Sequence, residues 1–171
     1  MKLSTSFWIR TIIGSGMDLD DPILNGEQAA SLDEAQSHLA FKIVGARAIG
    51  DPYGIFVTGP LDTEDGFRSL GLTYHSEQFG QVDVVEAPAQ LTEQEWEKAA
   101  ATAVGDVGQP GYYGSAVLEP LDSGSPVLVT TTPDGSISIA EWVQGGVDIA
   151  VLGPALQSDQ AKTIAKAISA A

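Results

Sequence analysis

The chain has 171 residues, of which 43% are apolar, and this is enough for one domain with a hydrophobic core. Eight Lys and Arg stand against 23 Asp and Glu, which gives a formal net charge of −15. Such a surface repels phosphate backbones and anionic lipid head groups, so no nucleic acid partner is expected. The absence of cysteine excludes disulfides, thiolate zinc sites and cysteine nucleophiles. No apolar run approaches the roughly 20 residues of a membrane span, so we expect no direct membrane insertion of this chain.

Residues 1–16 differ in composition from the rest of the chain. Residues 3–13 are rich in β-branched and aromatic side chains, as strands are, and Gly14-Ser15-Gly16 is typical of a flexible linker. Met17 stands where a native chain would start. We therefore interpret 1–16 as a leader or tethered strand added by engineering, or else as a native first strand with its loop, and 17–171 as a single α+β domain.

Three helices are predicted from their capping residues. Ser31-Leu32-Asp33-Glu34 is a capping box that opens a short helix, and Thr92-Glu93-Gln94-Glu95 opens a longer helix that ends near Val104. Ser158 is expected to cap the last helix. That helix has an apolar stripe and a side expected to face water: Ala161, Ile164, Ala165 and Ile168 form the stripe, and Lys162 and Lys166 lie on the other side.

Eight stretches have the composition of strands and are bounded by turn residues. They cover residues 41–44, 53–58, 67–75, 79–86, 112–118, 126–132, 136–143 and 147–152. Three short turns between them predict hairpins: Ser76-Glu77-Gln78, Pro133-Asp134-Gly135 and Gln144-Gly145-Gly146.

In the last of these stretches, large apolar side chains occupy every second position and alternate with Asp148 and Ala150. Alternation of this kind predicts a strand with one buried face. Together the elements predict an α+β fold, a twisted antiparallel sheet (meander) with helices packed on one face.

Residues that could carry catalysis are few. The serine-hydrolase elbow, the P-loop and the G-x-G-x-x-G motif are absent. His75 ends a predicted strand and could act as a base or a metal ligand if carboxylates converge on it, or it could be a rim histidine without chemistry. Glu86, Glu119, Glu141 and Asp148 lie in or beside strands, and two of them on opposing strands could form a hydrolytic pair. The sequence favours no particular pair.

Two acidic clusters offer oxygen ligands of the kind that calcium prefers, Asp18-Leu19-Asp20-Asp21 and Asp62-Thr63-Glu64-Asp65-Gly66. Neither has the spacing of an EF-hand, because Leu61 stands where the second cluster would need an acid. We therefore expect solvated acidic loops, no metal and no cofactor, with a weak calcium site as the alternative left open.

Aromatic side chains supply the candidates for ligand binding. Tyr112 and Tyr113 follow a Pro-Gly bend and could line a groove, and Trp142 lies in a predicted hairpin strand. These three residues, with His75, are the candidate ligand-binding set. Packing in the core is the alternative for each aromatic side chain.

Three stretches carry a resemblance to a known family. They are Ser31-Leu32-Asp33-Glu34-Ala35-Gln36 before Phe41, Gly71-Leu72-Thr73-Tyr74 before Val82-Asp83-Val84-Val85-Glu86, and Glu141-Trp142-Val143-Gln144-Gly145-Gly146-Val147 with the strand and capped helix that follow. They resemble a bacterial domain family of unknown function, found outside the membrane at the C-terminal end of membrane-anchored proteins, including anti-sigma-factor-like regulators. The chain departs from that family at 47–53, where the family usually has two prolines.

The resemblance implies a curved sheet akin to lipoprotein-carrier folds, no catalytic residues and no defined ligand. It also implies an extracytoplasmic location, at the cell surface or secreted. We therefore expect a non-catalytic binding or sensing domain of a bacterial membrane-anchored protein, and not an enzyme. The alternative is a small hydrolase that uses strand carboxylates or His75.

A peptide or protein segment is the expected partner, bound by strand addition. Residues 3–13 alternate in the way a strand does, and a short tether raises their local concentration to roughly millimolar. We expect them to pair along a sheet edge, with Phe7 or Trp8 buried. The sequence does not indicate an oligomeric state.

Overall fold

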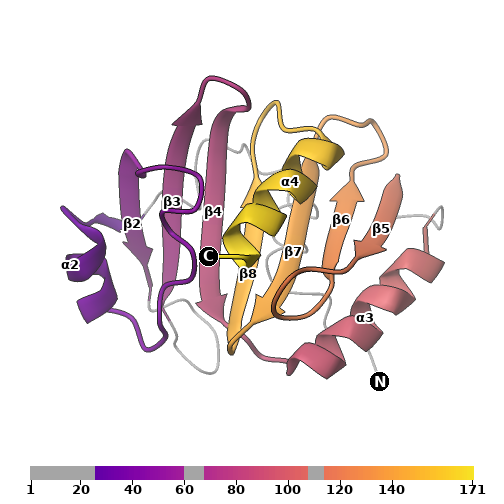
Figure 1. Cartoon of the computed structure of the whole chain (residues 1–171), viewed down its shortest axis with the longest axis horizontal. Helices are drawn as coiled ribbons and strands as arrows, with labels where there is room; N and C mark the ends of the chain where they lie inside the picture. Colours follow the sequence, from indigo (N-terminus) through magenta and orange to yellow (C-terminus); the bar gives the residue numbers. More distant parts are fainter. Residues whose placement is uncertain (1–25, 60–67, 108–113) are drawn as a thin grey trace.

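The computed structural model describes residues 26–59, 68–107 and 114–171, which form one eight-stranded antiparallel sheet with three helices (Figure 1). The spatial order of the strands is β1-β2-β3-β4-β8-β7-β6-β5, so two successive meanders meet where β4 pairs with β8. This confirms the predicted α+β class and the antiparallel sheet. The strands are β1 (Glu27–Gln28), β2 (Gly54–Thr58), β3 (Ser69–Ser76), β4 (Gly80–Pro88), β5 (Ser115–Glu119), β6 (Val127–Thr131), β7 (Ser138–Gln144) and β8 (Val147–Leu152).

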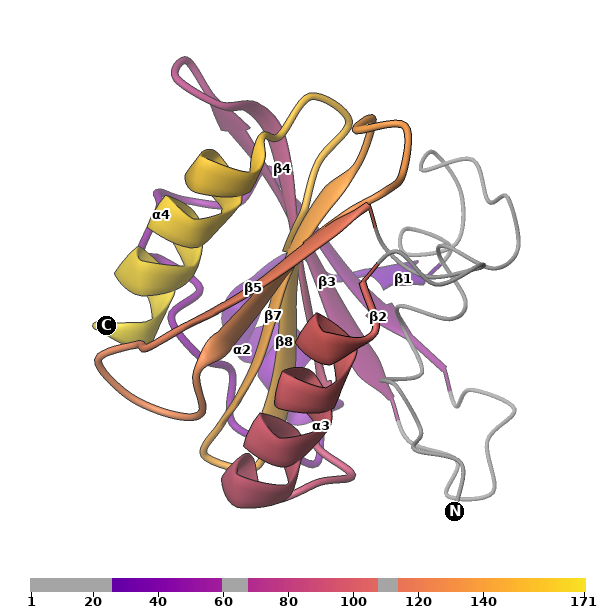
Figure 2. The ribbon, with the colours of Figure 1, turned by 90° about the vertical axis from the view of Figure 1, so that its right-hand side faces the viewer.

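The helices are α2 (Leu32–Ser37), α3 (Glu93–Gly105) and α4 (Ser158–Ser169), and they cover both faces of the twisted sheet. Figure 2 looks along the sheet and shows α4 and α3 on opposite sides of it. We call the face that carries Trp142 the α4 face and the face that carries Val143 the α3 face. Consecutive strand residues point to opposite faces, so these neighbours in β7 belong to two separate cores.

The larger core lies on the α4 face. The predicted apolar stripe of α4 is buried there against Trp142 and its neighbours in the sheet, and α2 joins the same core through Ala35. On the other face, Trp96 and Ala100 of α3 pack with Leu128 of β6. The sequence predicted helices packed on one face of the sheet. In the structure α2 and α4 share one face, and α3 covers the other.

Local signals position several elements correctly. The Thr92–Glu95 capping box is present: Thr92 Oγ1 accepts from the Glu95 amide at 3.3 Å, and a Glu95 carboxylate oxygen accepts from the Thr92 amide at 2.9 Å. Gly145 and Gly146 have φ of 58° and 80° between β7 and β8, which fits the two-residue hairpin turn expected there. The prediction for the last helix was wrong by one residue, because Gln157 is the N-cap and Ser158 is the first helical residue.

The predicted strand at 41–44 is also wrong: residues 39–53 contain no helix and no strand. Side chains satisfy the backbone of this segment in place of a strand ladder. Gln36 donates to the Phe41 carbonyl at 2.7 Å and accepts from the Ile43 amide at 3.0 Å. A strand partner is therefore not needed, and the segment packs as irregular chain against the α4 face through Val44.

Candidate functional site

The structure separates the residues that the sequence proposed for ligand binding. Trp142 has no exposed surface and lies in the core under α4, where its Nε1 donates to Gln144 Oε1 at 3.1 Å. His75 is exposed at the end of β3, opposite Gln81, and the strand registers place it on the α3 face. The two side chains therefore do not meet. Tyr112 and Tyr113 lie outside the described residues.

The two acidic clusters that the sequence offered as calcium ligands, at 18–21 and 62–65, also lie outside the described residues. Within the described ranges, no group of three His, Cys, Asp or Glu side chains could hold a metal ion. The same ranges contain no helix that is long and apolar enough to cross a membrane.

Two of the four strand carboxylates do come together. Glu141 of β7 is opposite Ala150 of β8, two positions from Asp148, so both carboxyl groups point to the α3 face. Glu141 has no exposed surface, and Asp148 keeps some exposure while its Oδ1 is buried. Burial raises the pKa of Asp148 to about 7, and a hydrogen bond with Glu141 acts in the opposite direction. The face of β8 that the alternation predicted to be buried is buried, and Ala150 on the α3 face is buried as well.

A third carboxyl group, Asp83 of β4, lies on the same face and is 6% exposed. Burial raises the pKa of Asp83, and a hydrogen bond from Gln81 Nε2 to Oδ2, at 3.0 Å, opposes this rise. The α3 face thus carries an acidic interior. A fully buried acid such as Glu141 reaches no dissolved substrate unless the groups that cover it move, so this geometry favours proton binding over catalysis.

Glu86 of β4 points to the α4 face and has no exposed surface. Its Oε2 accepts from the Val44 amide at 2.9 Å, and its Oε1 has no hydrogen-bond partner in the described part of the chain. Burial raises the pKa of Glu86 to about 8, although the bond from Val44 lowers it. Glu86 therefore fastens the irregular segment to the sheet and is not placed to act on a substrate.

One edge of the sheet, at β5, carries an open site. This strand pairs with β6 on one side and has no described neighbour on the other. Val117 in its centre is 50% exposed, unlike the buried centres of β6, β7 and β8. A hollow of about 80 Å³ lies between β5 and α4, lined by Ser115, Val117, Glu119, Val129, Ser158, Asp159 and Lys162.

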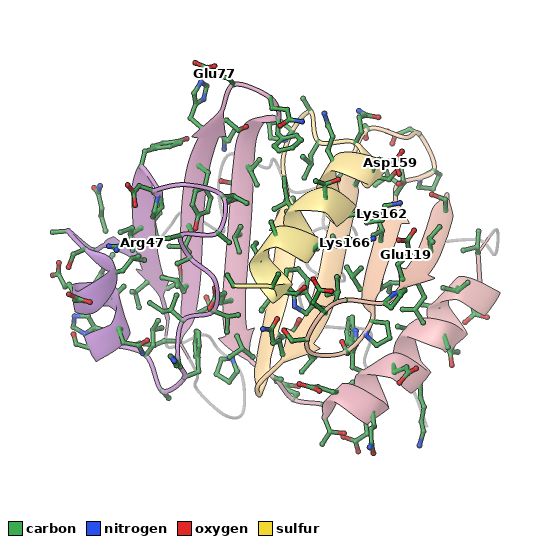
Figure 3. The ribbon with its side chains drawn as sticks, in the orientation of Figure 1. Arg47, Glu77, Glu119, Asp159, Lys162 and Lys166 are labelled. Atoms are coloured by element: carbon green, nitrogen blue, oxygen red, sulfur yellow. The ribbon has the colours of Figure 1, made fainter. Side chains whose placement is uncertain are left out.

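Ion pairs join α4 to β5 beside this hollow (Figure 3). Lys162 Nζ lies 3.0 Å from Glu119 Oε1 and 3.2 Å from Asp159 Oδ1, and Lys166 Nζ lies 3.6 Å from Glu119 Oε2. Hydrogen bonds with Glu119 and Asp159 raise the pKa of Lys162. Glu119 is therefore paired with two lysines, and two acidic side chains offset two basic ones beside the hollow.

Sequence reasoning missed this site. Lys162 and Lys166 were expected to face water. Lys166 does so, with a side chain that is 51% exposed, whereas that of Lys162 is only 28% exposed; both ammonium groups pair with Glu119. The polar side of α4 did contain the signal, since two lysines four residues apart lie on one face of a helix. Nothing local to α4 indicated that a glutamate of β5 would lie beside them.

Comparison of the chain with protein-family models, with curated proteins and with solved structures finds no match. The family resemblance described from the sequence stays a prediction.

Proposed function

We propose that this chain is a non-catalytic, extracytoplasmic binding or sensing domain of a bacterial membrane-anchored protein, and that it binds an extended segment of a partner protein as an added strand along β5. The observation that carries the proposal is the outer edge of β5, which has no neighbouring strand among the described residues and lies beside the hollow under α4. The extracytoplasmic setting is supported by the family resemblance alone.

An edge strand presents a row of N–H and C=O groups that an extended peptide can pair with. Ser115, Val117 and Glu119 occupy alternate positions of β5 and line the hollow together. A strand added beside them places every second side chain over the same hollow. The exposed centre at Val117 suits an apolar side chain of the partner.

Charge narrows the class of partner further. The net charge of −15 favours a basic segment, both in its approach and once bound. Glu119 is already paired with two lysines, whereas the Asp159 side chain is 91% exposed and pairs with Lys162 alone among the ion pairs described. The partner is thus an extended segment that alternates apolar residues and carries a basic residue near Asp159.

Binding can be tested with a synthetic peptide of alternating valine and threonine with a lysine at each end, titrated into the full chain and followed by backbone amide shifts. We expect the shifts to centre on β5 and α4 and to be lost in Val117→Lys, which places a charge on the edge. Tyr53→Lys is the matched control, because Tyr53 is another exposed large side chain at 63% and lies near β2. Equal binding by both variants would refute the proposal.

Two other occupants of the edge would give different results. A second copy of the chain would appear as a dimer in sedimentation that Val117→Lys converts to monomer. Residues 3–13 of the chain itself would block the peptide until residues 1–16 are deleted. Failure of the peptide to bind either form, with no dimer, would also refute strand addition at β5.

The hydrolase alternative rests on the Glu141–Asp148 pair. These two carboxyl groups share a face and a hydrogen bond, but their burial leaves a substrate no direct contact with Glu141. Hydrolytic turnover that is lost in Asp148→Asn or His75→Ala, with folding intact, would replace the binding proposal.

A further inference from the structure

The segment of residues 39–53, which we call the strap, joins α2 to β2 without forming a helix or a strand. Two side chains of the sheet hold its backbone on the α4 face: Glu86 accepts from the Val44 amide, and the Tyr74 hydroxyl donates to the Ala46 carbonyl. Between these ties, Gly45 has φ of 58° and lies so close to Ile168 of α4 that a β-carbon would be 2.8 Å from its Cγ2. The strap is thus closely packed, but it has no strand ladder to hold it.

Glu86 is the buried tie of the strap. It lies opposite Leu70 of β3 and Ile149 of β8, both apolar and fully buried. One of its carboxyl oxygens has a single described donor and the other has none. An ionised carboxylate in such a place keeps little of its hydration, so the protonated acid is the favoured form while the strap is closed.

The other charged or titratable groups near Glu86 do not neutralise it. Tyr74 of β3 contributes to the same core. Burial, then the charges of Glu86 and Asp51, raise the pKa of Tyr74, so its hydroxyl keeps its proton and remains a donor. Within the strap, Arg47 pairs with Asp51 at 3.7 Å, and both side chains are largely exposed. The described residues of α4 and β8 that join this core are apolar: Ala161, Ile164, Ala165, Ile168, Val147, Ile149 and Val151.

We propose that Glu86 is a proton-controlled latch: the strap is closed on the sheet while Glu86 is protonated, and it opens when Glu86 loses that proton. Opening lets water reach the carboxylate, and the strap is the neighbour that can move. Leu70 and Ile149 are fixed in the sheet by their strands. The middle of the strap is tied to the sheet by single side-chain hydrogen bonds at Val44 and Ala46. Its two ends are held separately, by Gln36 of α2 and by the bond from the Tyr53 amide to the Thr73 carbonyl. This inference does not depend on binding at β5.

The pH dependence of strap opening follows from the difference in the pKa of Glu86 between the closed and the open form. The pKa of Glu86 is about 8 with the strap closed, and in an open, hydrated strap it returns toward the ordinary value of 4.5. The closed form is therefore fully favoured below about pH 4.5. Above it, the opening equilibrium rises about tenfold for each pH unit until about pH 8, where it levels off.

Amide hydrogen exchange at Val44 tests the latch in the full chain. After correction for the intrinsic exchange rate, we expect its protection to fall about tenfold per pH unit between pH 5 and pH 8. Glu86→Gln keeps an acceptor for the Val44 amide without a charge, so its protection should not change with pH. Asp148→Asn is the matched control, because it removes a buried carboxyl from the opposite face and should leave the slope at Val44 intact.

A flat profile in the wild type, or the same slope in Glu86→Gln, would overturn the proposal. The carboxyl carbon shift of Glu86 gives a second measurement that does not depend on the variant folding. We expect that shift to titrate clearly above pH 4.5 and no higher than about pH 8, because strap opening lowers the midpoint from the value of the closed form. A midpoint near 4.5 would contradict the latch. Protection at Ile149 in β8 separates local from global opening: it should exceed that at Val44 throughout, and equal protection at every pH would mean that no local strap opening occurs.

Discussion

Glu141 and Asp148 lie two positions out of register on neighbouring strands, and a hydrogen bond links their carboxyl groups on the α3 face. Neither belongs to the apolar clusters that pack against α3 and α4. The pair therefore places two titratable carboxyl groups on the α3 face of the central strands, opposite the face that carries Glu86. It gives the fold a dependence on pH that can be measured.

We predict that Asp148→Asn flattens the dependence of stability on pH. The pKa of Asp148 is raised to about 7 in the folded state from an ordinary value of 3.8. The contribution of Asp148 to the free energy of unfolding is therefore most favourable below about pH 4. It weakens as pH rises to about 7, by up to about 1.4 kcal/mol per pH unit. Urea unfolding at pH 5 and at pH 7.5 measures this. If the variant loses as much stability between the two values as the wild type, Asp148 is not the titrating group.

Trp142 and His75 should differ in their effect on stability. Trp142→Ala removes a fully buried side chain under α4 and should cost about 3–5 kcal/mol of unfolding free energy. His75→Ala changes an exposed position at the end of β3 and should stay within about 0.5 kcal/mol. Denaturant unfolding of both variants provides the comparison. A small effect of Trp142→Ala would show that this side chain is not a core residue.

The hairpin turn between β7 and β8 should require glycine. Gly146→Ala forces a side chain into φ of 80° and should cost about 1–2 kcal/mol of unfolding free energy. Gly105→Ala is the matched control, because both positions have open space for a β-carbon but Gly105 lies in α3 and is not among the glycines with positive φ. We expect it to stabilise the chain by about 0.5 kcal/mol. Thermal or urea unfolding distinguishes the two, and a neutral Gly146→Ala would contradict the turn assignment.

Calcium should have no effect on the fold. We predict that millimolar calcium leaves the melting temperature unchanged, because neither acidic cluster of the sequence has the spacing of an EF-hand. A clear upward shift would place a site in one of the acidic clusters, at 18–21 or 62–65, since a ligand that binds only the folded state raises its stability.

Signals within a few residues of one another allowed much of this fold to be predicted. Thr92 with Glu95 set the start of α3, and Gly145 with Gly146 set the last hairpin, because both depend on neighbouring residues. Residues 41–44 were predicted as a strand because their backbone partners, the side chains of Gln36 and Glu86, are not visible in local composition.

The sequence-based predictions that were wrong or incomplete concern contacts between segments that are distant in the chain. Asp148 has the alternation of a strand with one solvated face, and only the burial of the α3 face turns it into an interior acid. Lys162 has the position of a solvated helix residue until Glu119 is placed beside it by the pairing of β5 with β6. The candidate site at β5 is made by such a contact, so no local sequence signal pointed to it.

Strand addition at β5 is the central claim, and amide hydrogen exchange in β5 tests it most directly. With the valine and threonine peptide bound, every second amide of β5, those that point away from β6, should gain protection, because a paired edge donates its outward N–H groups to the new strand. The amides that already bond to β6 should change little. Protection that rises at alternate residues supports strand addition. Peptide binding that leaves all β5 amides exchanging as in the free chain would contradict it.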